Sequence, residues 1–145
     1  MTEPKRILVP LDFSEQSLRA LAYAKTIAKP FAASLDLLHV VPNPYVADPS
    51  GLYTPLPQNF LDDLERDART RLDESLPTDE RSAPRARSLV TVGDPLLEIV
   101  SCAHSEHIDL IVMGTHGRTG ISHLFLGSVA ERVVRTAPCP VLTVR

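Results

Sequence analysis

The sequence predicts an α/β fold, in which an open, parallel, five-stranded sheet carries helices on both faces. Short apolar runs alternate along the chain with longer amphipathic segments. The apolar runs lack the polar alternation of half-exposed strands, which is typical of strands buried on both faces. Helix-starting residues follow two of these runs directly. Strands separated by helices pair in parallel through right-handed crossovers, so the helices cover both faces.

The first strand is predicted at residues 6–11, where an apolar run ends at Asp12. Residues 12–14 offer N-cap chemistry to a helix whose apolar positions recur at helical spacing. Pro30 does not fit an uninterrupted helix, so this helix is predicted to end near Lys29. A second buried strand is predicted at residues 34–41, which a proline terminates.

Residues 42–58 contain five prolines and are predicted to form a long loop, which suggests a lid or a mobile segment. Beyond it, helical and apolar patterns continue to alternate. Pro95 is expected at the first position of the third helix, where its missing N–H costs nothing. The predicted elements are a helix at 59–76, a strand at 86–92, a helix from 95, a strand at 109–113, a helix at 128–137 and a strand at 140–144.

The 145 residues predict one domain, spanning 1–145, with no internal repeat. The formal net charge of −3 argues against a nucleic-acid partner, which would favour a basic surplus. No apolar run approaches the roughly 20 residues that a membrane helix needs, and no secretory signal is recognised. Two cysteines are too few for a disulfide framework, so the expected location is cytoplasmic.

Glycines are concentrated in one segment of the chain. Four of the six lie between Gly114 and Gly127, from the end of the fourth strand to the start of the last helix. Glycine lets the backbone approach a ligand closely, and the amides at a helix start attract anions. The segment is therefore a candidate phosphate-binding loop, or else a turn that uses glycine for its geometry. Ser128 starts a capping-box pattern, so it could cap its helix, face a phosphate, or do both.

Several known phosphate loops and related folds do not fit. The segment lacks the Gly-Lys-Ser/Thr of a Walker loop, and a dinucleotide fingerprint would follow the first strand, where there is no glycine. A response-regulator receiver would need an acidic pair after the first strand and a lysine closing the fifth. A flavin carrier would need a hydroxyl- and glycine-rich loop after the first strand. None of these features is present.

The glycine spacing resembles the nucleotide-binding signature of the universal stress protein family. Gly114 is followed after two residues by Gly117, and after nine more by Gly127 and Ser128. The resemblance covers essentially the whole chain. Other segments that look like the family, in order, are residues 9–14, 38–41, 109–117 and 137–144.

This resemblance implies a Rossmann-like fold, similar to the adenine nucleotide alpha hydrolases, with strand order 3-2-1-4-5. The strand order reverses between the first and fourth strands, so Asp12 and Gly114 become neighbours. The implied ligand is ATP, with Asp12 accepting hydrogen bonds from the ribose hydroxyls. Residues implied around the adenine are Pro10, Leu11, Val40 and Met113. Residues implied around the phosphates are Gly114, Gly117, Arg118, Gly127, Ser128 and Val129. A divalent cation, Mg²⁺ or Mn²⁺, is implied as a bridge between phosphates, with no protein ligand assigned.

The resemblance also implies a homodimer, in which strand 140–144 pairs antiparallel with its copy in a second subunit. No general base for hydrolysis stands out, which favours a regulatory nucleotide-binding module in the stress response over an enzyme. The alternative is a slow ATPase or a nucleotidyl-transferring enzyme on the same fold.

The remaining reactive side chains have plainer interpretations. His39 is expected as a hydrogen-bonded core histidine, and Cys139 has no paired base in the sequence that would make it a nucleophile. The pair His104 and His107 has a spacing that a metal could use, but surface histidines fit better. Side chains with a possible contact to the nucleotide are those of His116, His123, Tyr45 and Tyr53.

Overall fold

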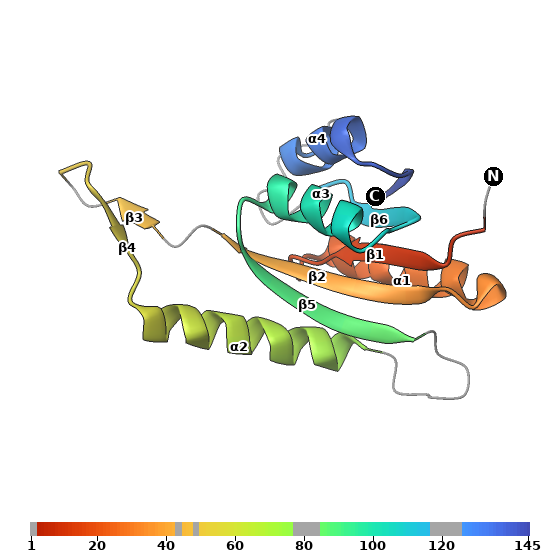
Figure 1. The fold of residues 1–145 in the computed structure, drawn as a ribbon, viewed down its shortest axis with the longest axis horizontal. Coiled ribbons are helices and arrows are strands. Elements are labelled where there is room, and N and C mark those ends of the chain that lie inside the picture. The colour runs from red at the N-terminus through yellow and green to blue at the C-terminus, as the bar shows by residue number, and fades with distance from the viewer. Residues whose placement is uncertain (1–2, 43–44, 48–49, 77–84, 117–125) are drawn as a thin grey trace.

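The computed structural model describes residues 3–42, 45–47, 50–76, 85–116 and 126–145, and these form an α/β domain (Figure 1). Its main sheet has the order β5-β2-β1-β6-β7, with every neighbouring pair parallel. Counting only the strands of this sheet, that is the expected order 3-2-1-4-5. The strands are β1 (Arg6–Pro10), β2 (Ser34–Pro42), β5 (Ala86–Gly93), β6 (Leu110–Gly114) and β7 (Val141–Val144). The helices are α1 (Glu15–Phe31), α2 (Gln58–Ser75), α3 (Pro95–Ser105) and α4 (Ser128–Thr136).

Helices cover both faces of the sheet, as the sequence predicts. In Figure 1, α3 and α4 lie above the sheet and α2 lies below it. Successive residues of β1 face opposite sides: Ile7 and Val9 belong to the core that α1 and α2 cover, and Leu8 to the core under α3 and α4. All three are fully buried, which explains the uninterrupted apolar run in the sequence.

Helix α1 extends further than predicted. Ser14 is its N-cap and accepts a hydrogen bond from the N–H of Ser17, as expected from the sequence. The helix continues through Pro30 to Phe31, so the prediction that it ends near Lys29 was two residues short. A proline in the last turn removes one N–H, and the N–H of Ala32, in a left-handed conformation, still donates to the last carbonyls.

The proline-rich segment contains regular structure that the sequence analysis missed. Strands β3 (Tyr45–Ala47) and β4 (Tyr53–Pro55) pair antiparallel in a two-stranded ribbon, which extends away from the main sheet (Figure 1). Prolines are compatible with extended backbone at strand ends, and Pro55 ends β4. Strands of three residues are too short to leave a periodic signal. That this segment acts as a lid stays a prediction.

An ion-pair cluster lies at the amino ends of the strands. The side chain of Asp36 is 2% exposed and contacts Arg6 at 2.8 Å and Arg87 at 2.7 Å. Both arginines also contact Glu106, and these contacts lower the pKa of the Glu106 carboxyl. The sequence analysis did not identify this cluster, since its members lie on β1, β2, β5 and the end of α3.

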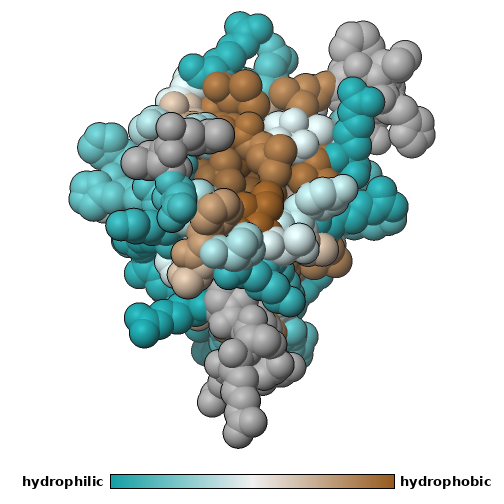
Figure 2. All heavy atoms as spheres, turned by 90° about the vertical axis from the view of Figure 1, so that its right-hand side faces the viewer, coloured by the Kyte–Doolittle hydropathy of each residue, from teal (hydrophilic) through white to brown (hydrophobic). Residues whose placement is uncertain are grey.

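The surface of the domain is not uniformly polar. Figure 2 shows the side of the molecule on which the N-terminus lies in Figure 1, and hydrophobic side chains gather in the middle of that face. Such a gathering is typical of a contact surface. Within the described residues, no helix combines the length and the apolar character that crossing a bilayer requires.

Candidate functional site

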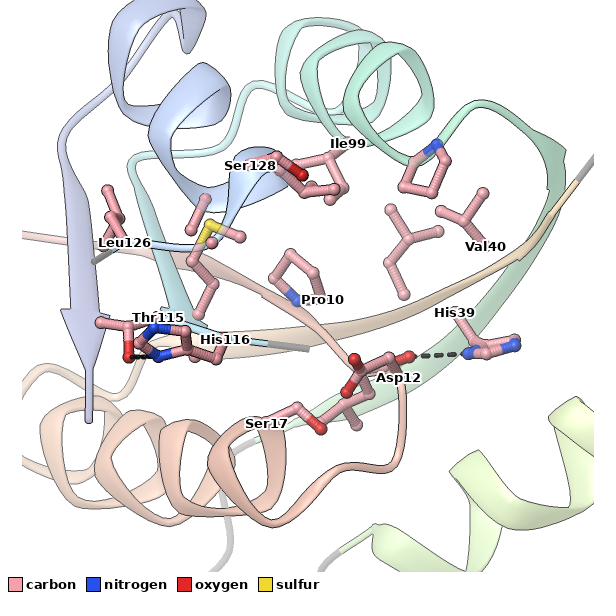
Figure 3. Close-up of a pocket in the computed structure, with 18 of the residues that line it drawn as sticks. Pro10, Asp12, Ser17, His39, Val40, Ile99, Thr115, His116, Leu126 and Ser128 are labelled. Carbon is pink, nitrogen blue, oxygen red and sulfur yellow. Dashed lines mark hydrogen bonds between the residues drawn. The ribbon is translucent and has the colours of Figure 1, made fainter. Parts of the chain in front are cut away.

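A cavity of about 580 Å³ opens at the carboxyl ends of β1, β2 and β6 (Figure 3). This is the place where the strand order reverses, since β1 has β2 on one side and β6 on the other. Nine of the eleven predicted site residues line it; the other two, Gly117 and Arg118, lie outside the described residues. The nine are Pro10, Leu11, Asp12, Val40, Met113, Gly114, Gly127, Ser128 and Val129.

The turn after β1 brings the Asp12 carboxylate to the cavity (Figure 3). The N–H of Leu11 donates to the carbonyl of Leu38 at 2.8 Å, which continues the β1–β2 ladder past the end of β1. Asp12 Oδ1 then accepts from both the N–H and the hydroxyl of Ser14, at 3.0 and 2.5 Å. Asp12 is therefore not the helix cap itself, and its carboxylate supports the capping residue while lining the cavity.

Two glycines allow the backbone to close tightly around the cavity. A Cβ on Gly127 would lie 2.8 Å from the carbonyl oxygen of Thr115, and the Gly127 N–H donates to that oxygen at 2.6 Å. A Cβ on Gly114 would lie 3.0 Å from the carbonyl carbon of Gln16, at the start of α1. Neither position can hold a larger residue without moving main-chain atoms.

The amino end of α4 faces this cavity. Its N-cap is Gly127, with no side-chain capping hydrogen bond, and Ser128 is the first helical residue. The alternative in which Ser128 caps the helix was therefore wrong, because the serine lies one position inside the helix. Its exposed side chain lines the cavity. The first amides of a helix and its dipole together favour an anion at this place.

The opposite part of the cavity is apolar. Leu38 and Val40 of β2 line it, and Ile99 of α3 lies above Val40 in Figure 3. A mostly apolar cavity with a few polar groups at one end is typical of small-molecule sites. The sequence analysis missed several lining residues, among which Ile99 and Ala130 are buried residues of α3 and α4. The lining residues not predicted as such are Ser17, Leu38, His39, Pro42, Pro95, Ile99, Thr115, Leu126 and Ala130.

Two histidines also line the cavity. His116 Nδ1 lies 2.9 Å from the Thr115 hydroxyl, and its buried Nε2 has no hydrogen-bond partner among the described residues. His39 Nδ1 lies 2.7 Å from the carbonyl oxygen of Leu11, which confirms the expected hydrogen bond. Because a carbonyl only accepts, Nδ1 carries the proton in this bond. The expected place in the core was wrong, because His39 is only partly buried and lines the cavity.

The other candidate side chains stay apart from the cavity or outside the described part. His104 and His107 are exposed, and no group of three metal-ligating side chains occurs among the described residues. His123 and the side chains of Tyr45 and Tyr53 lie outside what the structure describes. Burial raises the pKa of the Cys139 thiol, and burial together with nearby carboxylates raises that of Cys102 to about 11. Both thiols are therefore protonated at neutral pH.

These features define a class. The chain is a Rossmann-like α/β domain whose cavity at the switch point lies between an aspartate turn and a glycine-bounded helix start. Comparison with known proteins gives the family. The chain belongs to the universal stress protein family, whose profile matches residues 3–145.

Individual relatives cover nearly the whole chain. Universal stress protein MJ0531 of Methanocaldococcus jannaschii is 37% identical over 142 residues, which is 97% of this chain and 82% of the relative. A universal stress protein of Thermus aquaticus is 39% identical over 142 residues, 97% of this chain and 98% of the relative. The solved structure of protein MJ0577 of Methanocaldococcus jannaschii superimposes with a TM-score of 0.82 at 29% identity, covering 99% of this chain and 96% of that one.

A further solved relative carries a ligand. A universal stress protein in complex with cAMP superimposes with a TM-score of 0.65 at 26% identity, covering 99% of this chain and 98% of that one. This family therefore includes proteins that bind adenine nucleotides.

Proposed function

We propose that this universal stress protein binds ATP in the cavity described above and acts as a regulatory module, with a change of conformation or of partner as its output. One observation carries the proposal: Asp12, Gly114, Gly127 and the start of α4 surround a single cavity at the switch point. The relative that binds cAMP supports the adenine nucleotide as the class of ligand.

The proposed orientation follows from the two ends of the cavity. Adenine fits the apolar end, for which the lining residues Pro10, Val40 and Met113 are proposed. The phosphates fit the polar end, where the amides at the start of α4 and the Ser128 hydroxyl can donate to their oxygens. The ribose then lies beside Asp12, whose carboxylate can accept hydrogen bonds from its hydroxyls. Gly117 and Arg118 are proposed at the phosphates on their place in the glycine signature alone.

A divalent cation, Mg²⁺ or Mn²⁺, is proposed to bridge the phosphates. Among the described residues, Asp12 is the one carboxylate that lines the cavity, and no group of three ligating side chains occurs. The cation would therefore be coordinated mainly by phosphate oxygens and water, where it would neutralise phosphate charge.

The direct test is calorimetric titration of the protein with ATP, together with mass spectrometry of any nucleotide released on denaturation. Saturable heat from ATP, or a released adenine nucleotide, supports the proposal. Absence of both would refute it.

Replacing Asp12 tests the ribose contact. We expect Asp12→Ala to weaken the binding of ATP about 10- to 100-fold, because hydrogen bonds to a charged group contribute about 1.5–3 kcal/mol. The variant should also lose the preference for ATP over 2′-deoxyATP, measured as the ratio of the two Kd values. Ser14→Ala removes the cap but keeps the carboxylate, so it should lower stability and retain the preference. An Asp12→Ala variant that keeps the preference contradicts the assignment.

The proposed homodimer uses the outer edge of β7. The carbonyl of Pro140 accepts from Ile111 of β6, and that of Val144 accepts from Thr115, just after β6. Alternation along the strand therefore points the backbone groups of Val141 and Thr143 away from β6. Leu142 on this strand is 38% exposed. An unpaired sheet edge is a template for a second strand, and an antiparallel copy of β7 would cover it.

Thr143→Pro tests this edge, since proline removes the outward N–H and leaves the bonds to β6 in place. We expect wild type and Thr143→Val to sediment as dimers and Thr143→Pro as a monomer in analytical ultracentrifugation. A dimer of unchanged stability in Thr143→Pro would place the contact elsewhere.

A further inference from the structure

The turn that carries Asp12 is held in a strained conformation by side chains that come from two other elements of the fold. Phe13, the next residue, has a φ of 64°, in the left-handed region that bulky side chains rarely adopt. Such a conformation persists only where the surroundings stabilise it. Two contacts of the Phe13 ring provide this stabilisation, and they come from different elements.

The first contact comes from β2. The His39 ring lies 4.8 Å from the Phe13 ring, centroid to centroid, at an interplanar angle of 32°. The same imidazole donates from Nδ1 to the carbonyl of Leu11, as Figure 3 shows beside Asp12. His39 therefore holds the residues on both sides of Asp12, one through its ring face and the other through a hydrogen bond.

The second contact comes from helix α2. The guanidinium carbon of Arg71 lies 3.9 Å from the centre of the Phe13 ring, within the range of a cation–π interaction. Arg71, Phe13 and His39 therefore form a chain of contacts from α2 to the Asp12 turn. Arg71 does not line the cavity.

We infer that Arg71 is a positioning residue for Asp12, and that through it helix α2 sets how well the cavity discriminates the ribose of its nucleotide. This inference rests on the proposed ATP site. Whatever shifts α2, which directly follows the β3–β4 ribbon, would then change the fit of the ribose without touching the nucleotide.

The experiment compares Arg71→Ala with Arg71→Lys and Arg69→Ala. Arg71→Ala removes the cation, Arg71→Lys keeps one over the ring, and Arg69→Ala makes the same change of charge at an exposed residue two positions away on α2. Calorimetry gives the ratio of Kd values for 2′-deoxyATP and ATP. We expect Arg71→Ala to lower this ratio about 2- to 5-fold, the range that an exposed cation–π contact supports. The ratio in Arg71→Lys should lie close to the wild-type ratio, and the ratio in Arg69→Ala should equal it.

A double-mutant cycle separates positioning from a general loss of stability. If Arg71 acts through Asp12, Arg71→Ala should have no further effect on the ratio in an Asp12→Ala background. Two results would overturn the inference while leaving the ATP site intact. One is a further fall in the ratio of Kd values when Arg71→Ala is added to Asp12→Ala, and the other is an unchanged ratio in Arg71→Ala alone.

A ligand-free measurement covers the case in which wild type does not bind ATP. The Ser14 amide donates to Asp12, so its hydrogen exchange, followed by NMR, reports on the turn. We expect it to exchange about 2- to 5-fold faster in Arg71→Ala and at the wild-type rate in Arg69→Ala. Unchanged exchange in Arg71→Ala overturns the positioning role, whereas failure of ATP to bind wild type overturns the proposed function and, with it, the ribose part of the inference.

Discussion

Gly127→Val is expected to weaken the binding of ATP by about 100-fold or more. A Cβ at this position would meet the main-chain oxygen of Thr115 at 2.8 Å, and that oxygen cannot turn away as a flexible side chain could. The start of α4 must then move relative to β6. Hydrogen bonds from two of its amides to phosphate contribute about 1.5–3 kcal/mol each, so their loss accounts for the expected weakening.

Calorimetric titration with ATP checks this result, and thermal melting checks that the variant is folded. Gly51→Val is the matched control, because Gly51 lies on an exposed segment with nothing within 4 Å of an added Cβ. Its φ of 80° makes valine strained there, so this control should lose some stability and keep its affinity. A folded Gly127→Val protein with wild-type affinity would show that the phosphates lie elsewhere.

Asp36→Ala is expected to lower the free energy of unfolding by about 2–3 kcal/mol, and Tm by about 5–10 °C. The carboxylate is buried between Arg6 and Arg87, and its removal leaves the two guanidinium groups to share the more exposed carboxylate of Glu106. The effect falls short of that for a fully buried pair, because the arginine side chains are 33% and 46% exposed and water can solvate them.

Urea denaturation with linear extrapolation measures this loss. The control is Asp63→Ala, which breaks an exposed pair with Arg66 and should change stability by no more than about 1 kcal/mol. ATP affinity should be unchanged in both variants, since Asp36 lies toward the amino end of β2, away from the cavity. A fully stable Asp36→Ala protein would mean that the cluster contributes nothing net to folding.

The sequence predicts the main sheet well because its strands are covered on both faces. In β1 and β2 this burial leaves nearly continuous apolar runs in the sequence. The glycine signature likewise predicted that Gly114 and Gly127 lie at one cavity. Main-chain atoms approach both residues so closely that a side chain would not fit, and this requirement is visible in the sequence as glycine. The order of the strands, by contrast, came from resemblance, since local periodicity carries no information on which strands are neighbours.

What sequence reasoning missed depends on contacts between distant segments. The left-handed Phe13 is stabilised by Arg71 and His39, which are remote in the chain. Asp36 within an apolar run is compatible with burial only because arginines of two other strands reach it. The short β3 and β4 pair with each other and not with the main sheet, and three residues are too few for a periodic signal in the sequence.

The common direction of the five strands has a practical consequence for engineering this molecule. It puts the ion-pair cluster near the amino ends of β1 and β2, and the cavity proposed for the nucleotide at their carboxyl ends. Heat tolerance can then be optimised at one end of these strands, and ligand preference at the other, in separate rounds of substitution whose gains should combine additively.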